Sequence, residues 1–477
     1  MRRVAAAALA ATVSACSLAP RYERPAAPVP AVAGVEPTAA TTLARGADAI
    51  GWRDVFADPR LQAVVALALE NNRDLRVAAL NVELVRAQYR IQRSARFPQL
   101  DATGSVTRQR TPHDLSATGN SSLGNVWSAG AGLSAFELDF FGRVKSLSDA
   151  ALEQYLSTEE ARRSAHLSLV AAVATEYLAE RAWDDQVLLS QRTLELVQSS
   201  LALTRRTFEA GRTNELDLRT AEAQVETAKF NLSISRERRA QAANALAFLV
   251  GRPLPADLPA PTPLDAQALV ADLPAGVSSE VLLRRPDILA AEHSLQGANA
   301  LVGAARAAFF PSITLTAFGG TASAQLDGLF QPGSEAWSFT PRLNLPIFHG
   351  GALAASLDAA KVRKQIQVAQ YERAIQGAFR EVADALVARA EIEEQVRAQA
   401  ARVQADQRRY DLSDLRYRRG VDSYLVVLTA QRDLYASQLL LIQARLGRLS
   451  NLVDLYRALG GGWLERTGGA AVVASER

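Results

Sequence analysis

Two periods of apolar and polar residues run along this chain, and they predict strands in some segments and helices in others. Over residues 127–135 and 337–345, apolar or small side chains occupy every odd position, which is the period of a half-buried strand. Residues 100–106 and 313–317 alternate in a similar way. We therefore expect strands within residues 100–110, 125–141, 312–323 and 334–349.

Helix-breaking residues are unevenly distributed, which predicts two very long helical stretches. No proline occurs between Pro112 and Pro253, or from Pro346 to the end of the chain. Within the second stretch, apolar residues recur at spacings of three, four and seven, as on one face of a helix. We expect helices over about 144–209 and 352–419, each on the order of 100 Å long. Globular domains rarely need helices of this length.

Matching motifs recur in the same order in both halves of the chain. Gly211 and Gly420 are 209 residues apart, as are Gly251 and Gly460. An ordered series of such matches indicates a duplication. Each repeat is expected to contain a helix, two strands and two long helices. The expected divisions are a leader over 16–60, repeats over 61–270 (long helices 144–250) and 271–460 (long helices 352–459), and a tail over 461–477.

The first residues have the composition of a bacterial export signal. Arg2 and Arg3 precede an apolar run over 4–13, and small residues then lead to Cys16. The residues before Cys16 resemble a lipobox, so we expect a signal peptide over 1–15 and lipid on Cys16. A plain secretory signal is the alternative. Cys16 is the only cysteine, so no disulfide within the chain competes for it.

Composition argues against several classes of function. The chain has 53 basic and 50 acidic residues, a near-balance that is not typical of a nucleic-acid-binding protein. The four histidines are scattered, and no zinc, phosphate-loop or nucleophile motif is found. We therefore expect neither catalytic residues nor a metal site, and no cofactor apart from the acyl chains on Cys16.

The strands raise the question of how the chain meets a membrane. No stretch offers about 18 consecutive apolar residues, so a spanning helix is not expected. Strands of period two fit a transmembrane barrel, although a half-buried soluble sheet has the same period. Four strands per chain are too few, because the smallest membrane barrels need about eight. The membrane interpretation therefore requires an oligomer, and three copies would supply twelve strands.

Four longer motifs are individually weak but highly specific together. They are residues 132–143 (GLSAFELDFFGR), 284–288 with 303–311 (RRPDI and GAARAAFFP), 417–432 and 459–463 (LGGGW). Their combination resembles the TolC family of outer-membrane factors, and is most similar to OprM/NodT-type lipoproteins of resistance-nodulation-division (RND) efflux pumps. The similarity extends over nearly the whole chain.

The resemblance implies a fold, partners and a location. Family members are homotrimers whose strands form one twelve-stranded β-barrel, which long periplasmic helices continue. A small mixed equatorial domain surrounds the helices, and it would contain the N-terminal segment and the tail. The expected location is the outer membrane of a Gram-negative bacterium, with Ser17 after Cys16 rather than the Asp that retains lipoproteins at the inner membrane. The expected partners are a periplasmic adaptor (membrane fusion protein) and an inner-membrane RND pump.

The resemblance also points to a gate at the periplasmic ends of the paired helices. These ends fall at Gly211 and Gly420, where glycine suits a positive φ. Leu425 corresponds to an apolar aperture ring and Tyr417 to a tyrosine that links neighbouring helices. The remaining candidates are charged: Asp217, which corresponds to a residue that holds the closed state, and Asp422 and Arg432, which are placed to form salt bridges.

Two positions depart from the family pattern, and three other functions remain open. The acidic sites of many members correspond to Thr429 and Val426, and Asp433 is the carboxylate that could replace them. A periplasmic helical lipoprotein acting as adaptor or spacer would explain the helices, but not the alternating strands. A channel for type I secretion or metal efflux would share this fold. An enzyme is the third alternative.

Overall fold

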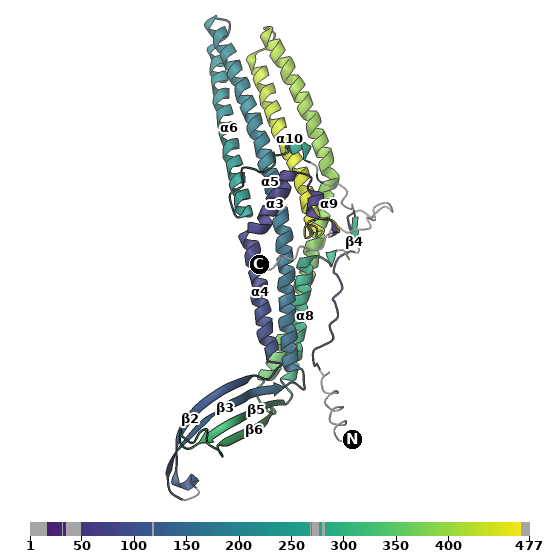
Figure 1. Cartoon of the computed structure of the whole chain (residues 1–477). Helices are drawn as coiled ribbons and strands as arrows, with labels where there is room; N and C mark the ends of the chain where they lie inside the picture. Colours follow the sequence, from purple (N-terminus) through teal and green to yellow (C-terminus); the bar gives the residue numbers. More distant parts are fainter. Residues whose placement is uncertain are drawn as a thin grey trace. The chain divides into compact units, whose positions relative to one another are not determined.

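The computed structural model describes residues 17–30, 32–34, 49–116, 119–267, 269, 276–278 and 282–468 (Figure 1). The expected signal peptide and Cys16 lie outside these residues. The chain forms two compact units. Unit 1 comprises Met1–Ala26, Asn81–Glu159 and Ala290–Glu372, and unit 2 comprises Ala27–Leu80, Glu160–Leu289 and Arg373–Arg477.

Unit 1 contains one antiparallel sheet of four strands in the order β2-β3-β5-β6. β2 (Leu100–Thr111) pairs with β3 (Ser122–Leu138), and β5 (Ser312–Ser323) pairs with β6 (Glu335–Asn344). Each repeat thus supplies one hairpin, and the β3–β5 pairing joins the two hairpins. At this seam a Cβ on Gly130 would lie 2.5 Å from the carbonyl oxygen of Gly319, so only glycine fits there.

β3 has an irregularity near its end. The β3–β5 register shifts between Leu133 and Phe136, and Ala135 has a φ of 47°. Among the described residues Ala135 is the only non-glycine with a positive φ. An extra residue of this kind is a β-bulge, which bends a strand and increases its twist.

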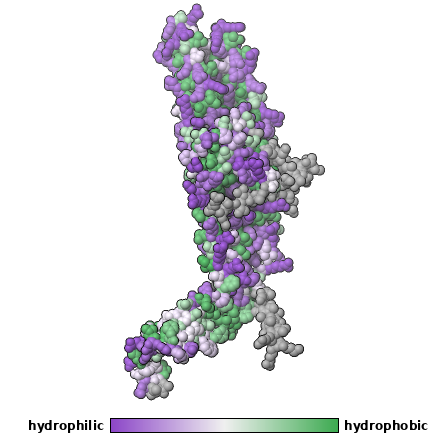
Figure 2. Space-filling view, in the orientation of Figure 1, coloured by the Kyte–Doolittle hydropathy of each residue, from purple (hydrophilic) through white to green (hydrophobic). Residues whose placement is uncertain are grey.

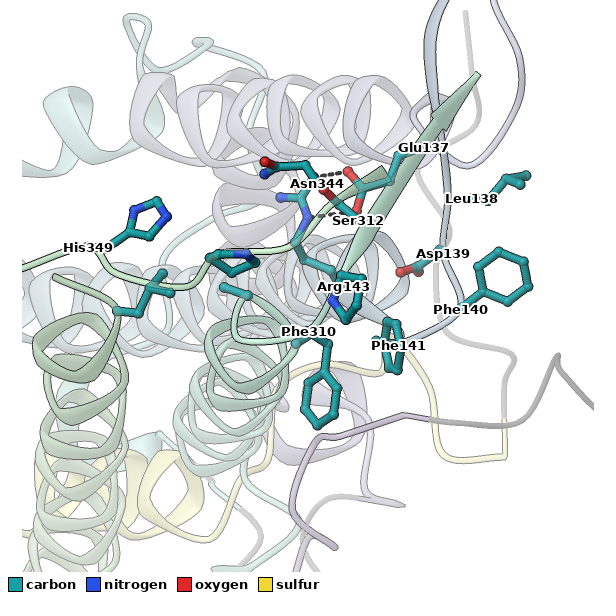
Figure 3. Close-up of a pocket in the computed structure, with 15 residues that line it drawn as sticks. Glu137, Leu138, Asp139, Phe140, Phe141, Arg143, Phe310, Ser312, Asn344 and His349 are labelled. Carbon is teal, nitrogen blue, oxygen red and sulfur yellow. Dashed lines mark hydrogen bonds and ion pairs between the residues drawn. The ribbon is translucent and has the colours of Figure 1, made fainter. Parts of the chain in front are cut away.

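A short connection separates β3 from α5 (Arg143–Glu209) and explains the first of the longer motifs (Figure 3). Glu137 accepts hydrogen bonds from Nε of Arg143, at 2.9 Å, and from its Nη2. The carboxylate of Asp139 accepts from the backbone N–H of Lys145, at 2.6 Å, and so satisfies a free donor of the first helical turn. β3 therefore ends at Leu138, before the expected residue 141.

The connection after β6 also begins earlier than expected. β6 ends at Asn344 instead of residue 349, because Asn344 pairs with Ser312, the first residue of its partner strand β5. Asn344 and Pro346 line the same pocket as Glu137 and His349 (Figure 3). In this pocket the rings of Phe141 and Phe310 stack with centroids 4.7 Å apart.

The helices have matching lengths in the two repeats. α5 and α9 (Ala352–Arg418) each contain 67 residues, and α4 (Arg73–Ser94) and α8 (Pro286–Ala307) each contain 22. α6 (Glu215–Val250) and α10 (Tyr424–Ala458) contain 36 and 35 residues. The predicted fold class, mainly helical with a four-stranded sheet in each chain and an internal repeat, is confirmed.

Smaller elements complete the described chain. They are β1 (Val32–Gly34), α2 (Trp52–Val55), α3 (Pro59–Asn71), η3 (His113–Leu115), η4 (Leu264–Ala266) and β4 (Gly276–Ser278), with β1 antiparallel to β4. None of the described helices is both long and apolar enough to cross a membrane.

In unit 2, equivalent side chains hold the ends of α6 and α10. Nδ2 of Asn72 donates to the carbonyl oxygen of Leu249 at 2.8 Å, and Nη1 of Arg285 donates to that of Ala458 at 2.7 Å. Asn72 comes directly before α4, and Arg285 comes directly before its counterpart α8. The last carbonyls of a helix have no partner within the helix, so these contacts satisfy them.

Arg285 also joins three segments of unit 2 and explains the RRPDI motif. Its side chain is 7% exposed and its guanidinium contacts the carboxylates of Asp287, at 2.7 Å, and Glu381, at 3.0 Å. Because one cation is buried against two carboxylates and a helix end, the start of α8 is fixed to α9 and α10.

The LGGGW motif fastens the segment after α10 to α5 and α2. Trp463 lies beneath the guanidinium of Arg162, at 5.4 Å, and beside the ring of His166, at 5.0 Å. The backbone N–H of Trp52 then donates to the carbonyl oxygen of Leu464 at 2.9 Å. Burial, together with the charge of Arg162, lowers the pKa of His166 to about 4.

Candidate functional site

The turn between α5 and α6 is closed by a glycine. Gly211 has a φ of 68°, and its N–H donates to the carbonyl oxygen of Phe208 at 2.8 Å. The N–H of Arg212 reaches back to the carbonyl oxygen of Thr207, also at 2.8 Å. This pair of bonds is a Schellman motif, in which a left-handed residue ends a helix and satisfies its last carbonyls.

The turn between α9 and α10 is built in the same way. Gly420 has a φ of 72°, and its N–H donates to the carbonyl oxygen of Tyr417. The N–H of Val421 donates to the backbone carbonyl oxygen of Arg416. The two turns lie at the same end of unit 2 (Figure 1). A side chain at Gly211 or Gly420 would meet no other atom within 4 Å. Backbone conformation alone therefore favours glycine at both turns.

An ion pair crosses the second turn. Nε and Nη2 of Arg416 donate to the two carboxylate oxygens of Asp422 at 2.6 and 2.9 Å. The hydrogen bond from Arg416 lowers the pKa of Asp422. A bidentate guanidinium–carboxylate pair has a defined geometry, so it restrains the segment between α9 and α10.

Tyr424, the first residue of α10, anchors this end of the helix to α5 and α6. It is 2% exposed and packs with Ala221 and Val427, while its ring centroid lies 5.4 Å from that of Tyr417. The hydroxyl of Ser200 donates to its phenolic oxygen at 3.1 Å. Burial chiefly, and also the carboxylate of Asp217, raise the pKa of Tyr424.

Leu425 lies next to this anchor but is 64% exposed. Its repeat equivalent Leu216 is 72% exposed, and Val421 and Val426 are exposed as well. Figure 2 shows apolar residues mixed with polar ones over these helix ends. Burying exposed leucine is favourable by about 2 kcal/mol, so these residues suit contacts that one copy of the chain does not make.

Of the charged candidates, Asp217 lies in the first turn of α6, Asp422 lies just before α10, and Arg432 lies further along α10. Asp217 is half-buried, and its N–H donates to Oδ1 of Asn214, the N-cap of α6, at 2.9 Å. Arg432 lies 3.6 Å from Asp433, which also contacts Nη2 of Arg409 at 2.5 Å. Asp422 pairs with Arg416, so Arg432 and Asp422 have different partners within the chain.

Thr429 stands where many family members carry an acidic residue, and its hydroxyl is hydrogen-bonded within its own helix. The hydroxyl of Thr429 donates to the carbonyl oxygen of Leu425 at 2.9 Å. The hydrogen bond from Arg409 lowers the pKa of Asp433, and its carboxylate lies between two guanidiniums. In this arrangement Asp433 balances arginine charge and does not add a free negative charge.

Sequence reasoning named Tyr417, Leu425 and the two glycines as candidates, but it did not name Arg416, Tyr424 or Ser200. Arg416 carried a signal, because it precedes Asp422 by six residues around a helix-ending glycine. Ser200 carried none, since it is an ordinary polar residue far from the turn in sequence. Only the packing of α5 against α10 brings it to Tyr424.

The class indicated here is that of membrane export proteins. It is indicated by exposed apolar residues at paired helix ends, long helices and a sheet of alternating strands. Comparison with known proteins agrees with this class. The family model described as "Outer membrane efflux protein" matches residues 64–252 and 277–461. The chain belongs to this family. It is a component of a transport system and not an enzyme.

Similar proteins extend over nearly the whole chain. The "Toluene efflux pump outer membrane protein TtgC" of Pseudomonas putida is 50% identical over 96% of this chain and 95% of its own length. "Outer membrane protein OprJ" of Pseudomonas aeruginosa is 44% identical, covering 97% of this chain and 96% of its own. The open state of the Neisseria gonorrhoeae MtrE outer membrane channel has a TM-score of 0.86 at 43% identity, over 95% and 100% of the two chains. The chain is therefore an outer-membrane efflux protein of the Gram-negative type.

Proposed function

We propose that three copies of this chain form a gated duct that conducts small organic molecules from the periplasm to the exterior. The observation that carries the proposal is the exposed Leu425 beside the buried Tyr424 at the end of two 67-residue helices. In a symmetric trimer the three copies of Leu425 would meet around one axis and narrow the tunnel.

A trimer also suits the sheet. β2 and β6 are the edges of the four-stranded sheet, and an exposed edge is a template for pairing with another chain. Pairing of β2 with β6 of a neighbour would leave no edge open. Three copies would bring twelve strands together, and the two structural repeats over 61–270 and 271–460 would alternate around the axis.

The gate would use the turn residues in different roles. Leu425 would form the aperture, Tyr417 would support it through Tyr424, and Asp422 would restrain the turn at Gly420. Asp217 and Arg432 would hold neighbouring helices in the closed arrangement. An adaptor and an RND pump in the inner membrane would supply the energy and shift the helix packing to an open state.

Two further features complete the proposal. Cleavage before Cys16 and acylation of its sulfur and amino group would attach the chain to the outer membrane, since acyl chains give reversible or stable anchoring according to their number. The names of the relatives refer to toluene, solvents and antibiotics. Apolar organic compounds are therefore the proposed cargo, ahead of secreted proteins or metal ions.

Single-channel conductance of the purified protein in planar bilayers tests the gate. Wild type is expected to open rarely, and Leu425→Ser to open more often or with larger conductance. Leu440→Ser is the matched control, because Leu440 is an exposed leucine of the same helix, 50% exposed and far from the turn. Unchanged openings in Leu425→Ser would remove the gate assignment but leave the duct. Absence of any conductance would overturn the duct itself.

A further inference from the structure

The first described residues of the chain lie along α8 in a fixed order. Nη1 of Arg306 donates to the carbonyl oxygen of Leu18 at 3.3 Å, and Nδ2 of Asn299 donates to that of Pro20 at 2.8 Å. As the N-terminal segment proceeds, its partners move back along α8. The segment and the helix therefore run antiparallel, and all of these residues belong to unit 1.

These contacts come from one face of α8, which we call the track. Its contacts with the segment come from residues 292, 299, 303 and 306, at spacings of seven, four and three, which fall on one side of a helix. Between the two hydrogen-bonded positions, a Cβ on Gly303 would lie 2.7 Å from Cα of Ala19. Glycine at this position is what allows the backbone of the segment to contact the helix.

The far end of the track is a buried carboxylate. Glu292 is 4% exposed and accepts a hydrogen bond from the hydroxyl of Tyr22 at 3.0 Å. Its two oxygens also accept from Nε and Nη2 of Arg24, both at 2.8 Å. Tyr371 of α9 is fully buried nearby. A carboxylate removed from water requires partners, and the N-terminal segment supplies the cation.

The dimensions of the track match the segment. Fourteen residues of helix separate Glu292 from Arg306, a rise of about 21 Å. Six residues of extended chain from Leu18 to Arg24 span about 20 Å. Arg306 precedes Ser312, the first residue of β5, by six positions, so the beginning of the segment is held beside the start of the sheet.

We propose that this face of α8 is a binding site for the mature N-terminus, and that Glu292 is the residue that positions the lipid anchor. By holding Tyr22 and Arg24, Glu292 fastens Ser17–Arg24 along the helix. Lipid on Cys16, one residue further, then enters the membrane beside the strands. This inference rests on the proposed acylation of Cys16. The site itself does not depend on the gate.

Trypsin cleavage of the full-length protein purified in detergent tests the site, because Arg21 is a cleavage point within the segment, whereas Arg24 precedes Pro25 and is not cut. Cleavage after Arg21 separates the acylated N-terminus from the rest of the chain, which mass spectrometry detects. Wild type is expected to resist cleavage. Glu292→Gln keeps the shape of the side chain but removes its charge, and cleavage is expected to be at least tenfold faster.

A pair of glycine variants provides the control. Gly303→Ala places a methyl group against Ala19 and is expected to accelerate cleavage as Glu292→Gln does. Gly297→Ala makes the same change on the same helix, but its Cβ would lie 3.4 Å from the carbonyl oxygen of Ala150 and would not touch the segment. It is expected to cleave like wild type. Resistance of Glu292→Gln and Gly303→Ala equal to that of wild type would overturn the site.

The same spectra separate this inference from the proposed function. An N-terminal fragment without acyl mass would disprove lipidation of Cys16, whatever the cleavage rates of the variants. An acylated fragment that is released equally fast from wild type and Glu292→Gln would disprove the positioning role and leave lipidation intact.

Discussion

The guanidinium of Arg416 and the carboxylate of Asp422 form two hydrogen bonds across the glycine turn that joins α9 to α10. Gly420 lies between them with a left-handed backbone. The turn is therefore held by its backbone bonds and by one bidentate ion pair. The apolar residues Val421 and Leu425, which are exposed in the single chain, are displayed from this restrained segment.

Asp422→Asn is expected to loosen this turn at neutral pH. The pKa of Asp422 is lower in the folded protein than its ordinary value, so the pair stabilises the turn above about pH 4 and the stabilisation is lost as the pH falls through the folded pKa. Hydrogen exchange of residues 416–426 should be faster in Asp422→Asn at pH 7. Wild type should show the same change only below about pH 4.

Glu215→Gln is the control for this measurement, because Glu215 pairs with Arg219 at the start of α6, beside the other glycine turn. Exchange over 416–426 should then equal that of wild type. Equal exchange in Asp422→Asn and wild type at pH 7 would show that the glycine turn is held by its backbone bonds alone.

Arg285→Gln is expected to be strongly destabilising. The change leaves Glu381 and Asp287 without their buried cation, and breaking a buried pair in this way costs about 3 kcal/mol or more. The midpoint of urea unfolding should fall markedly. Arg284→Gln alters the exposed neighbour in the same motif and should leave the midpoint close to that of wild type. Equal midpoints for both variants would contradict the role assigned to Arg285.

Ala135→Gly is expected to stabilise the protein. Ala135 has a φ of 47°, and a left-handed conformation costs a residue with a Cβ about 1 kcal/mol relative to glycine. The same substitution at Ala131, in the regular part of β3, should be destabilising by roughly 0.5–1 kcal/mol. Thermal unfolding of the two variants should therefore shift in opposite directions. A lower midpoint for Ala135→Gly would show that its methyl group makes a compensating contact.

Acid is expected to weaken the attachment of the C-terminal segment. The pKa of His166 is about 4 in the folded protein, well below its ordinary value of about 6.5. Between these two values only the unfolded chain binds the proton, so stability falls as the pH drops through this window, by roughly 3 kcal/mol in total. The unfolding midpoint of His166→Gln should depend less on pH between 6.5 and 4. An equal dependence would assign the effect to other groups.

The sequence alone determined the periodic elements and their duplication. A helix of 67 residues follows from the absence of proline and the scarcity of glycine, because each residue of a helix bonds to another only four positions away. The positive φ of Gly211 and Gly420 was also predictable, since helix ends favour glycine for a local steric reason. Family membership followed from the longer motifs taken together.

Tertiary structure decided which distant residues meet. Nothing in the sequence indicates that Ser200 bonds to Tyr424, that Arg285 holds the end of α10, or that Glu292 receives Tyr22 and Arg24. These partners are 173 to 270 residues apart. Such contacts depend on how helices pack and which faces become buried, and a buried charge finds its partner in space and not along the chain. The sequence therefore predicts the elements and their ends, whereas the packing of the folded chain determines how those ends are held.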